Sequence, residues 1–154
     1  MRCEQLYGTF HWRKPDLMYL HPMYEDDCDA LKILDSCERK AIAEWSVKDF
    51  DDHPLIFDVF PAELSIYNWG CLLTAMCREG SKDSISLRYS LMNISSIKSP
   101  VPVHIWSRSS FRLTGEEKVC SLLFLDTLDS GSEFAAELSE VRDIIEYCES
   151  VFEE

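Results

Sequence analysis

The sequence predicts an α+β fold: a single domain over residues 1–154 with an antiparallel sheet of about three to five strands. The sheet is expected to pack against a long helix in the N-terminal half and an amphipathic C-terminal helix. Apolar residues recur with helical spacing between Pro22 and Pro54 and again at the C-terminal end, whereas from Ser84 onward their period changes to two. Strands grouped together, with helices before and after them, indicate α+β rather than alternating βαβ units.

Size and composition fit a globular protein of the cytoplasm. A chain of 154 residues, 46% apolar and 28% charged, is long enough to bury one core without disulfides. Its seven cysteines are an odd number scattered over the whole chain, and the first ten residues lack the apolar segment of a secretory signal. No stretch has the 18 or so consecutive apolar residues of a membrane-spanning helix. We therefore expect a cytoplasmic protein that does not enter membranes.

The first long helix is predicted at about residues 27–46. The stretch between Pro22 and Pro54 contains neither glycine nor proline, and either Asp26 or Asp27 can cap the helix by accepting hydrogen bonds from its first turn. Its apolar face comprises Ala30, Ile33, Leu34, Cys37, Ala41 and Trp45. The preceding 20 residues, in which aromatic and polar residues are mixed, could supply one further hairpin.

After Pro54 the chain becomes strongly apolar, and two interpretations compete. Helical spacing of Leu64, Tyr67, Cys71 and Ala75 predicts a buried helix that ends at Gly80. A strand through residues 66–73 is the alternative, because a glycine within a helix lowers its propensity.

The strands are predicted in the second half of the chain. Residues 85–91 alternate apolar and polar side chains, as in a half-buried strand, and residues 101–113 repeat the pattern. A turn is expected at residues 114–117, and residues 118–126, apolar on both faces, would form the central strand of a meander. The last element is a helix over residues 132–152, because Ser130 and Glu133 have the spacing of a capping box.

Charge is distributed unevenly along the chain, whose net charge is −13. Residues 1–77 carry 14 acids and 7 bases, residues 78–118 carry 4 and 7, and residues 119–154 carry 10 and 1. One interpretation is that this charge only keeps the protein soluble and monomeric. The other is that it selects partners: a negative surface repels nucleic acid and attracts basic proteins, so we expect a basic protein partner and no nucleic acid. The residues predicted to bind that partner are Glu25, Asp26, Asp27, Asp29, Asp49, Asp51 and Asp52.

In size, acidity and expected compartment the chain resembles bacterial immunity proteins and other small nuclease inhibitors of the barstar type, and also small phage inhibitors of host defence. The resemblance is one of profile and rests on no alignable motif. It implies a protein that binds and neutralises a toxin or effector with a basic, nucleic-acid-type active site. Association of such a pair can be accelerated electrostatically.

A second hypothesis places an anionic ligand, with or without catalysis, on the polar face of the predicted sheet. Alternating positions on one strand carry arginine interleaved with an aromatic, which is typical of anion-binding or protein-recognition surfaces. The residues are Arg88, His104, Trp106, Arg108 and Arg112. A third possibility is a subunit or adaptor that makes contacts through its aromatic N-terminal residues and residues 54–69.

The sequence predicts neither an enzyme nor a cofactor. The closest cysteine pairs, Cys71 with Cys77 and Cys28 with Cys37, are too far apart for a zinc finger, and the four histidines are dispersed. The five glycines form neither a dinucleotide-binding nor a Walker motif. We therefore expect no metal, no cofactor and no catalytic residue, whereas the oligomeric state is left open.

Overall fold

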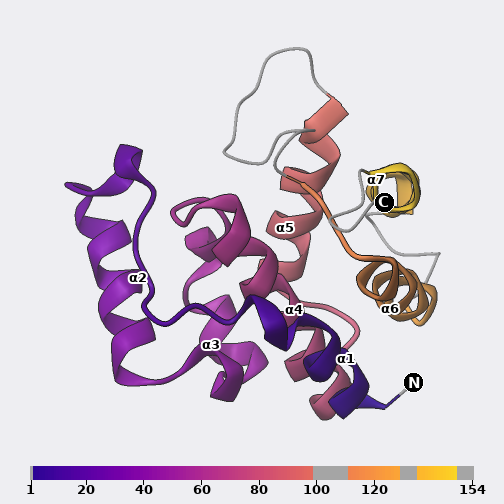
Figure 1. The fold of residues 1–154 in the computed structure, drawn as a ribbon, viewed down its shortest axis with the longest axis horizontal. Coiled ribbons are helices and arrows are strands. Elements are labelled where there is room, and N and C mark those ends of the chain that lie inside the picture. The colour runs from indigo at the N-terminus through magenta and orange to yellow at the C-terminus, as the bar shows by residue number, and fades with distance from the viewer. Residues whose placement is uncertain (1, 99–110, 129–134, 149–154) are drawn as a thin grey trace.

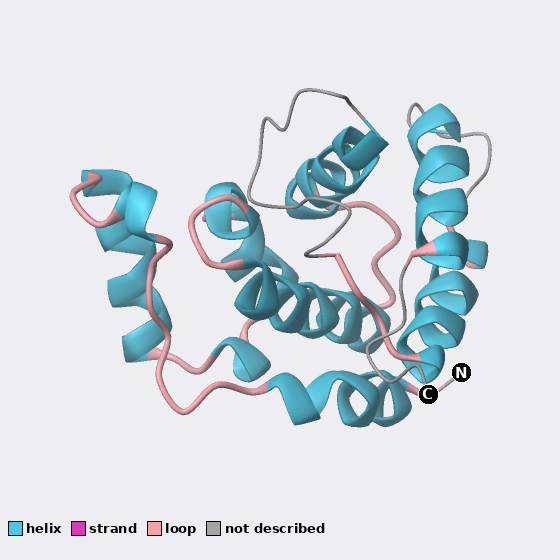
Figure 2. Ribbon diagram, turned by 45° about the horizontal axis from the view of Figure 1, so that its top comes forward, coloured by secondary structure: helices cyan, strands magenta, loops and turns pink. Residues whose placement is uncertain are grey.

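The computed structural model of the protein describes residues 2–98, 111–128 and 135–148, and every regular element in these ranges is a helix (Figures 1 and 2). The α-helices are α1 (Cys3–Phe10), α2 (Cys28–Arg39), α3 (Val47–Asp51), α4 (Ala62–Glu79), α5 (Ile85–Ser95), α6 (Gly115–Asp126) and α7 (Ala135–Tyr147). Short 3-10 helices lie in the connections: η1 (His11–Arg13), η2 (Pro22–Tyr24), η3 (Ile42–Glu44), η4 (Pro54–Phe57) and η5 (Ser96–Lys98). The predicted α+β fold is therefore wrong, because no strand of the expected sheet occurs in the described residues.

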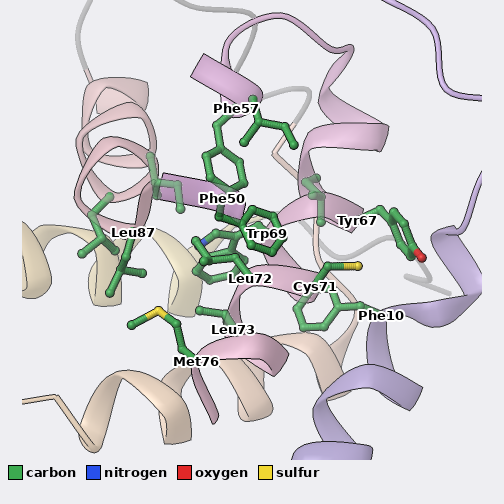
Figure 3. Close-up of a cluster of buried hydrophobic side chains, with 14 of the residues drawn as sticks. Phe10, Phe50, Phe57, Tyr67, Trp69, Cys71, Leu72, Leu73, Met76 and Leu87 are labelled. Carbon is green, nitrogen blue, oxygen red and sulfur yellow. The ribbon is translucent and has the colours of Figure 1, made fainter. Parts of the chain in front are cut away.

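Helix α4 forms the centre of the core, because every residue from Leu64 to Met76 is buried. Figure 3 shows its side chains gathered with those of Phe10, Phe50, Phe57 and Leu87 from other helices. The helix ends as predicted at Gly80, which has a φ of 66° that favours glycine. The N–H of Ser81 donates to the carbonyl of Met76 at 3.0 Å, so the end is a Schellman motif. Within the described residues no helix is long and apolar enough to cross a membrane.

The N-terminal residues form helix α1 and not the hairpin that the sequence suggested. Helix α1 packs along α4, and the ring of Phe10 lies directly over Gly70. A Cβ atom at position 70 would lie 2.4 Å from Cγ of Phe10, so only glycine allows this approach. The glycine that weakened the helical prediction for residues 64–80 thus has a packing role.

Helix α2 begins as predicted and ends earlier. Asp27 caps it, because its side chain accepts a hydrogen bond from the N–H of Ala30 at 2.9 Å. The helix stops at Arg39, and Lys40 is extended, with its carbonyl accepting the indole N–H of Trp45 at 2.9 Å. Trp45 is buried but is not helical, so its spacing extended the prediction too far.

Residues 85–91, predicted as a strand, are part of helix α5. The prediction assumed that Ser86 and Ser90 face solvent, but both are fully buried. Each hydroxyl is satisfied by a backbone carbonyl, since Ser86 donates to Phe50 at 2.5 Å and Ser90 donates to Leu87 at 2.7 Å. A small hydroxyl group can be buried when it finds such a partner, so serine does not mark the exposed face. Conversely, Ile85 is half exposed.

Residues 118–126, predicted as the central strand, belong to helix α6. The predicted turn at residues 114–117 is its capping box: the Thr114 hydroxyl accepts from the N–H of Glu117 at 3.1 Å, and the Glu117 carboxylate accepts from the N–H of Thr114 at 2.8 Å. Of the strand predicted over 101–113, residues 101–110 lie outside the described residues, and Phe111 and Leu113 are buried in the segment that leads into α6.

The predicted C-terminal helix is confirmed over Ala135–Tyr147 as α7. Its expected apolar face is buried at Leu138, Val141 and Ile145. The proposed cap, Ser130 with Glu133, and the expected ends of the helix at 132–134 and 149–152 lie outside the described residues.

A buried arginine joins three helices whose sequences lie far apart. The Arg13 side chain donates to the Glu117 carboxylate at 2.6 and 2.9 Å and to the Arg112 carbonyl at 2.7 Å. Its remaining terminal nitrogen, Nη1, donates to Glu63 in the first turn of α4 at 3.2 Å. The guanidinium is thus fully paired where η1, α4 and α6 meet, as a buried charge requires.

Candidate functional site

Exposed acids with no ion-pair partner among the described residues gather at the start of α2. Four acids occur within five residues and are all exposed; together they form what we call the acidic surface: Glu25, Asp26, Asp27 and Asp29. Helix α2 lies at one end of the molecule, and helices α6 and α7 lie at the other (Figure 1). The structure therefore brings together the first group of acids that the sequence predicted as a binding site.

Hydrogen bonds within this segment fix its shape, and one hydrogen bond joins it to the rest of the molecule. The N–H of His21 donates to the carbonyl of Val59 at 2.8 Å, and Nδ1 of His21 accepts from the N–H of Met23 at 3.1 Å. The N–H of Asp27 then donates to the carbonyl of Tyr24 at 3.1 Å, immediately before α2 begins. The acids are therefore presented from a defined turn and helix start.

The negative charge of the acidic surface is not neutralised by a neighbouring cation among the described residues. In the described part of the chain none of its four carboxylates forms an ion pair. The neighbouring Tyr24 responds to this environment: partial burial, followed by the negative charges of Asp58 and Asp27, raises the pKa of its hydroxyl above the usual value.

Exposed apolar side chains flank the acids, and they are not among the residues predicted from the sequence to form a site. Met23 is 74% exposed and Leu31 is 46% exposed. The N–H of Leu31 donates to the carbonyl of Asp27 at 3.0 Å, which places it one turn beyond the helix cap. The available signal was Leu31 itself, an apolar residue outside the apolar face predicted for this helix.

The second predicted acidic group, Asp49, Asp51 and Asp52, is engaged in structural contacts. Asp49 accepts from the N–H of Ser46 and from the Lys40 ammonium, both at 2.9 Å. Asp51 accepts from the Ser84 hydroxyl at 2.5 Å. Asp52 pairs with Lys48 one turn away. We therefore do not assign this group to the acidic surface.

Arg88, predicted to lie beside the polar face of a sheet, lies in helix α5. Arg88 there pairs with Asp83 at 2.7 Å. Arg112 is exposed in the segment before α6, where its carbonyl accepts a hydrogen bond from Arg13. The remaining predicted anion-binding residues, His104, Trp106 and Arg108, lie outside the described residues.

Within ranges 2–98, 111–128 and 135–148, no group of three or more histidine, cysteine or acidic side chains is placed to hold a metal ion. No family model, curated protein or solved structure matches the chain. The candidate site therefore rests on the charge and exposure of the acidic surface.

Proposed function

We propose that the protein binds and neutralises a basic protein partner through the acidic surface, Glu25, Asp26, Asp27 and Asp29. One observation carries the proposal: four exposed carboxylates lie within five residues, and none has an ion-pair partner in the described residues. Charges of one sign gathered on a protruding segment attract an oppositely charged protein over about a Debye length, roughly 8 Å at physiological salt.

The composition of the surface favours a protein over other ligands. Carboxylates repel the phosphates of nucleic acids, whereas they pair with lysine and arginine on a protein. Exposed Met23 and Leu31 add apolar area that charge pairing alone does not require. An interface of this kind combines fast electrostatic association with apolar contacts that slow dissociation.

The partner that fits is a toxin or effector whose active site is a basic cleft for nucleic acid, since carboxylates can take the place of phosphates there. The profile shared with immunity proteins and small nuclease inhibitors points the same way. We place this activity in the cytoplasm, where thiols stay reduced; the seven cysteines are free.

The experiment is capture of binding proteins from the native host on the immobilised chain, followed by calorimetric titration of the captured partner at about 50 mM and about 300 mM salt. We expect a partner with an excess of lysine and arginine, whose affinity falls about tenfold or more at the higher salt and whose activity is lost at equimolar ratio. An acidic partner, or an affinity that does not change with salt, would refute the proposal.

A further inference from the structure

Two thiols that are distant in sequence meet at one end of the α1 and α4 pair. The Cys3 thiol donates a hydrogen bond to Sγ of Cys77 at 2.6 Å, although the two residues are 74 positions apart. Both side chains are partly accessible to solvent. A disulfide bond is about 2.04 Å long, so the two sulfurs would have to approach by only about 0.6 Å to reach bonding distance.

The packing of the two helices holds these sulfurs in place. Phe10 lies over Gly70 near the middle of α4, and Cys3 meets Cys77 near its end, so the helices run antiparallel. Cys3 and Phe10 are seven residues apart, as are Gly70 and Cys77, so the two contacts lie two turns apart on both helices. The register that places Phe10 over Gly70 therefore also aligns the thiols.

We propose that Cys3 and Cys77 form a reversible intramolecular disulfide by exchange with a low-molecular-weight disulfide. One protein thiol, as its thiolate, attacks a sulfur of the small disulfide, whose S–S bond breaks and releases one small thiolate. The second protein thiol then attacks the resulting mixed disulfide at the protein sulfur and expels the second small thiolate. Two protein thiols are oxidised, one small disulfide is reduced to two thiols, and the two protons pass to them.

The environments of five of the seven cysteines indicate which thiols take part. Burial, followed by the hydrogen bond from Cys3, raises the pKa of the Cys77 thiol to about 11, so we expect Cys3 to attack first. Burial also raises the pKa of Cys37 and Cys71 to about 12, and neither is accessible. Cys28 is exposed, and no thiol contact is found for it in the described ranges, so we expect it to react with the small disulfide and stay as a mixed disulfide.

The crosslink would fasten the N-terminal helix to the central helix of the core. A disulfide between positions 74 residues apart restricts the unfolded chain and so stabilises the folded state. Disulfides of cytoplasmic proteins are typically transient and redox-sensing, which agrees with a pair that is reduced at rest and accessible. The proposed chemistry therefore acts on stability and does not require the acidic surface.

The test treats the native wild-type protein with oxidised glutathione, blocks free thiols and cleaves with cyanogen bromide. Cleavage after the five methionines leaves Cys3 alone in fragment 2–18 and Cys77 alone in fragment 77–92. We expect these two fragments to be linked to each other without glutathione, and Cys28 to carry glutathione. Separate glutathione adducts on Cys3 and Cys77, unmodified thiols at both positions, or links to other fragments would overturn the proposal.

Thermal unfolding provides the second measurement. Oxidation should raise the melting temperature of wild type by about 5 °C or more, and dithiothreitol should reverse the shift. The shift should vanish in Cys3→Ser and in Cys77→Ser and persist in the control Cys28→Ser. A shift that persists in Cys3→Ser would contradict the pairing. The fragment map of wild type decides the question if either serine variant fails to fold.

Discussion

The guanidinium of Arg13 and the carboxylate of Glu117 form a two-point ion pair inside the protein, with hydrogen bonds of 2.6 and 2.9 Å. Their side chains are 2% and 0% exposed, and they lie 104 positions apart in the sequence. The same carboxylate completes the capping box of α6, so one residue pairs a buried charge and starts a helix.

Replacing Arg13 with alanine should destabilise the protein by about 3–5 kcal/mol, because it leaves the Glu117 carboxylate buried without its cation. The control is Arg39→Ala. Arg39 pairs with Asp35 on the surface, where both side chains are more than half exposed, and its loss should cost about 0.5 kcal/mol or less. Urea unfolding measures both values, and equal costs for the two variants would show that Arg13 is not buried as described.

The contact between Phe10 and Gly70 predicts that alanine substitution has opposite effects on stability at Gly70 and at Gly8. Gly70→Ala should lower the free energy of unfolding by about 1–3 kcal/mol, because the new methyl group would meet the Phe10 ring. Gly8 is also helical, but a Cβ there would meet no atom within 4 Å. Gly8→Ala should therefore stabilise by about 0.5–1 kcal/mol. A stabilising Gly70→Ala would rule out the close packing of α1 on α4.

Substitution by leucine should change the stability of the protein in opposite directions at two buried asparagines. Both polar side-chain atoms of Asn68 lack a hydrogen-bond partner in the described residues, whereas Nδ2 of Asn93 donates to Asp58 at 2.7 Å. Asn68→Leu should stabilise by about 1–2 kcal/mol, because it removes unpaired polar atoms from the core, and Asn93→Leu should destabilise by a similar amount. Loss of stability in Asn68→Leu, measured by thermal and urea unfolding, would mean that Asn68 has a polar partner.

Asp49 predicts a pH dependence of stability. The hydrogen bond from the Ser46 N–H, followed by that from Lys40, lowers the pKa of Asp49. A lowered pKa in the folded state stabilises the protein above the unfolded pKa of about 3.9, and this contribution is lost as pH falls through the folded pKa. Asp49→Asn should therefore cost about 1 kcal/mol or less at about pH 7, and less below about pH 4. A cost that grows on acidification would contradict this sign.

Local signals in the sequence predicted part of the fold correctly. The cap at Asp27 and the stop at Gly80 each depend on one residue and its neighbours, and the apolar face of the C-terminal helix depends on regular spacing. The capping box of Thr114 with Glu117 is an equally local signal, but the same residues also fit the turn that the sequence predicts there. The alternation over residues 85–91 predicted a strand incorrectly. Serine counts as a polar, exposed residue in such a pattern, but these serine hydroxyls are buried and donate to backbone carbonyls.

The sequence predicts only that part of the candidate site whose residues are neighbours along the chain. The acids between Glu25 and Asp29 are adjacent in sequence, so their gathering follows from the chain itself. The structural contacts of Asp51 with Ser84, and of Arg13 with Glu117, join residues 33 and 104 positions apart. Their pairing depends on how the helices pack, which periodicity does not encode.

The most direct test of the proposed function compares two charge reversals at opposite ends of the molecule. Glu25→Lys with Asp26→Lys changes the acidic surface without touching the helix cap, and Asp143→Lys with Glu146→Lys changes exposed acids on α7. Each pair changes the net charge by the same four units, from −13 to −9. The association rate constant of the captured partner should fall about tenfold or more for the first pair and much less for the second. Equal rates for the two double variants would contradict binding through the acidic surface.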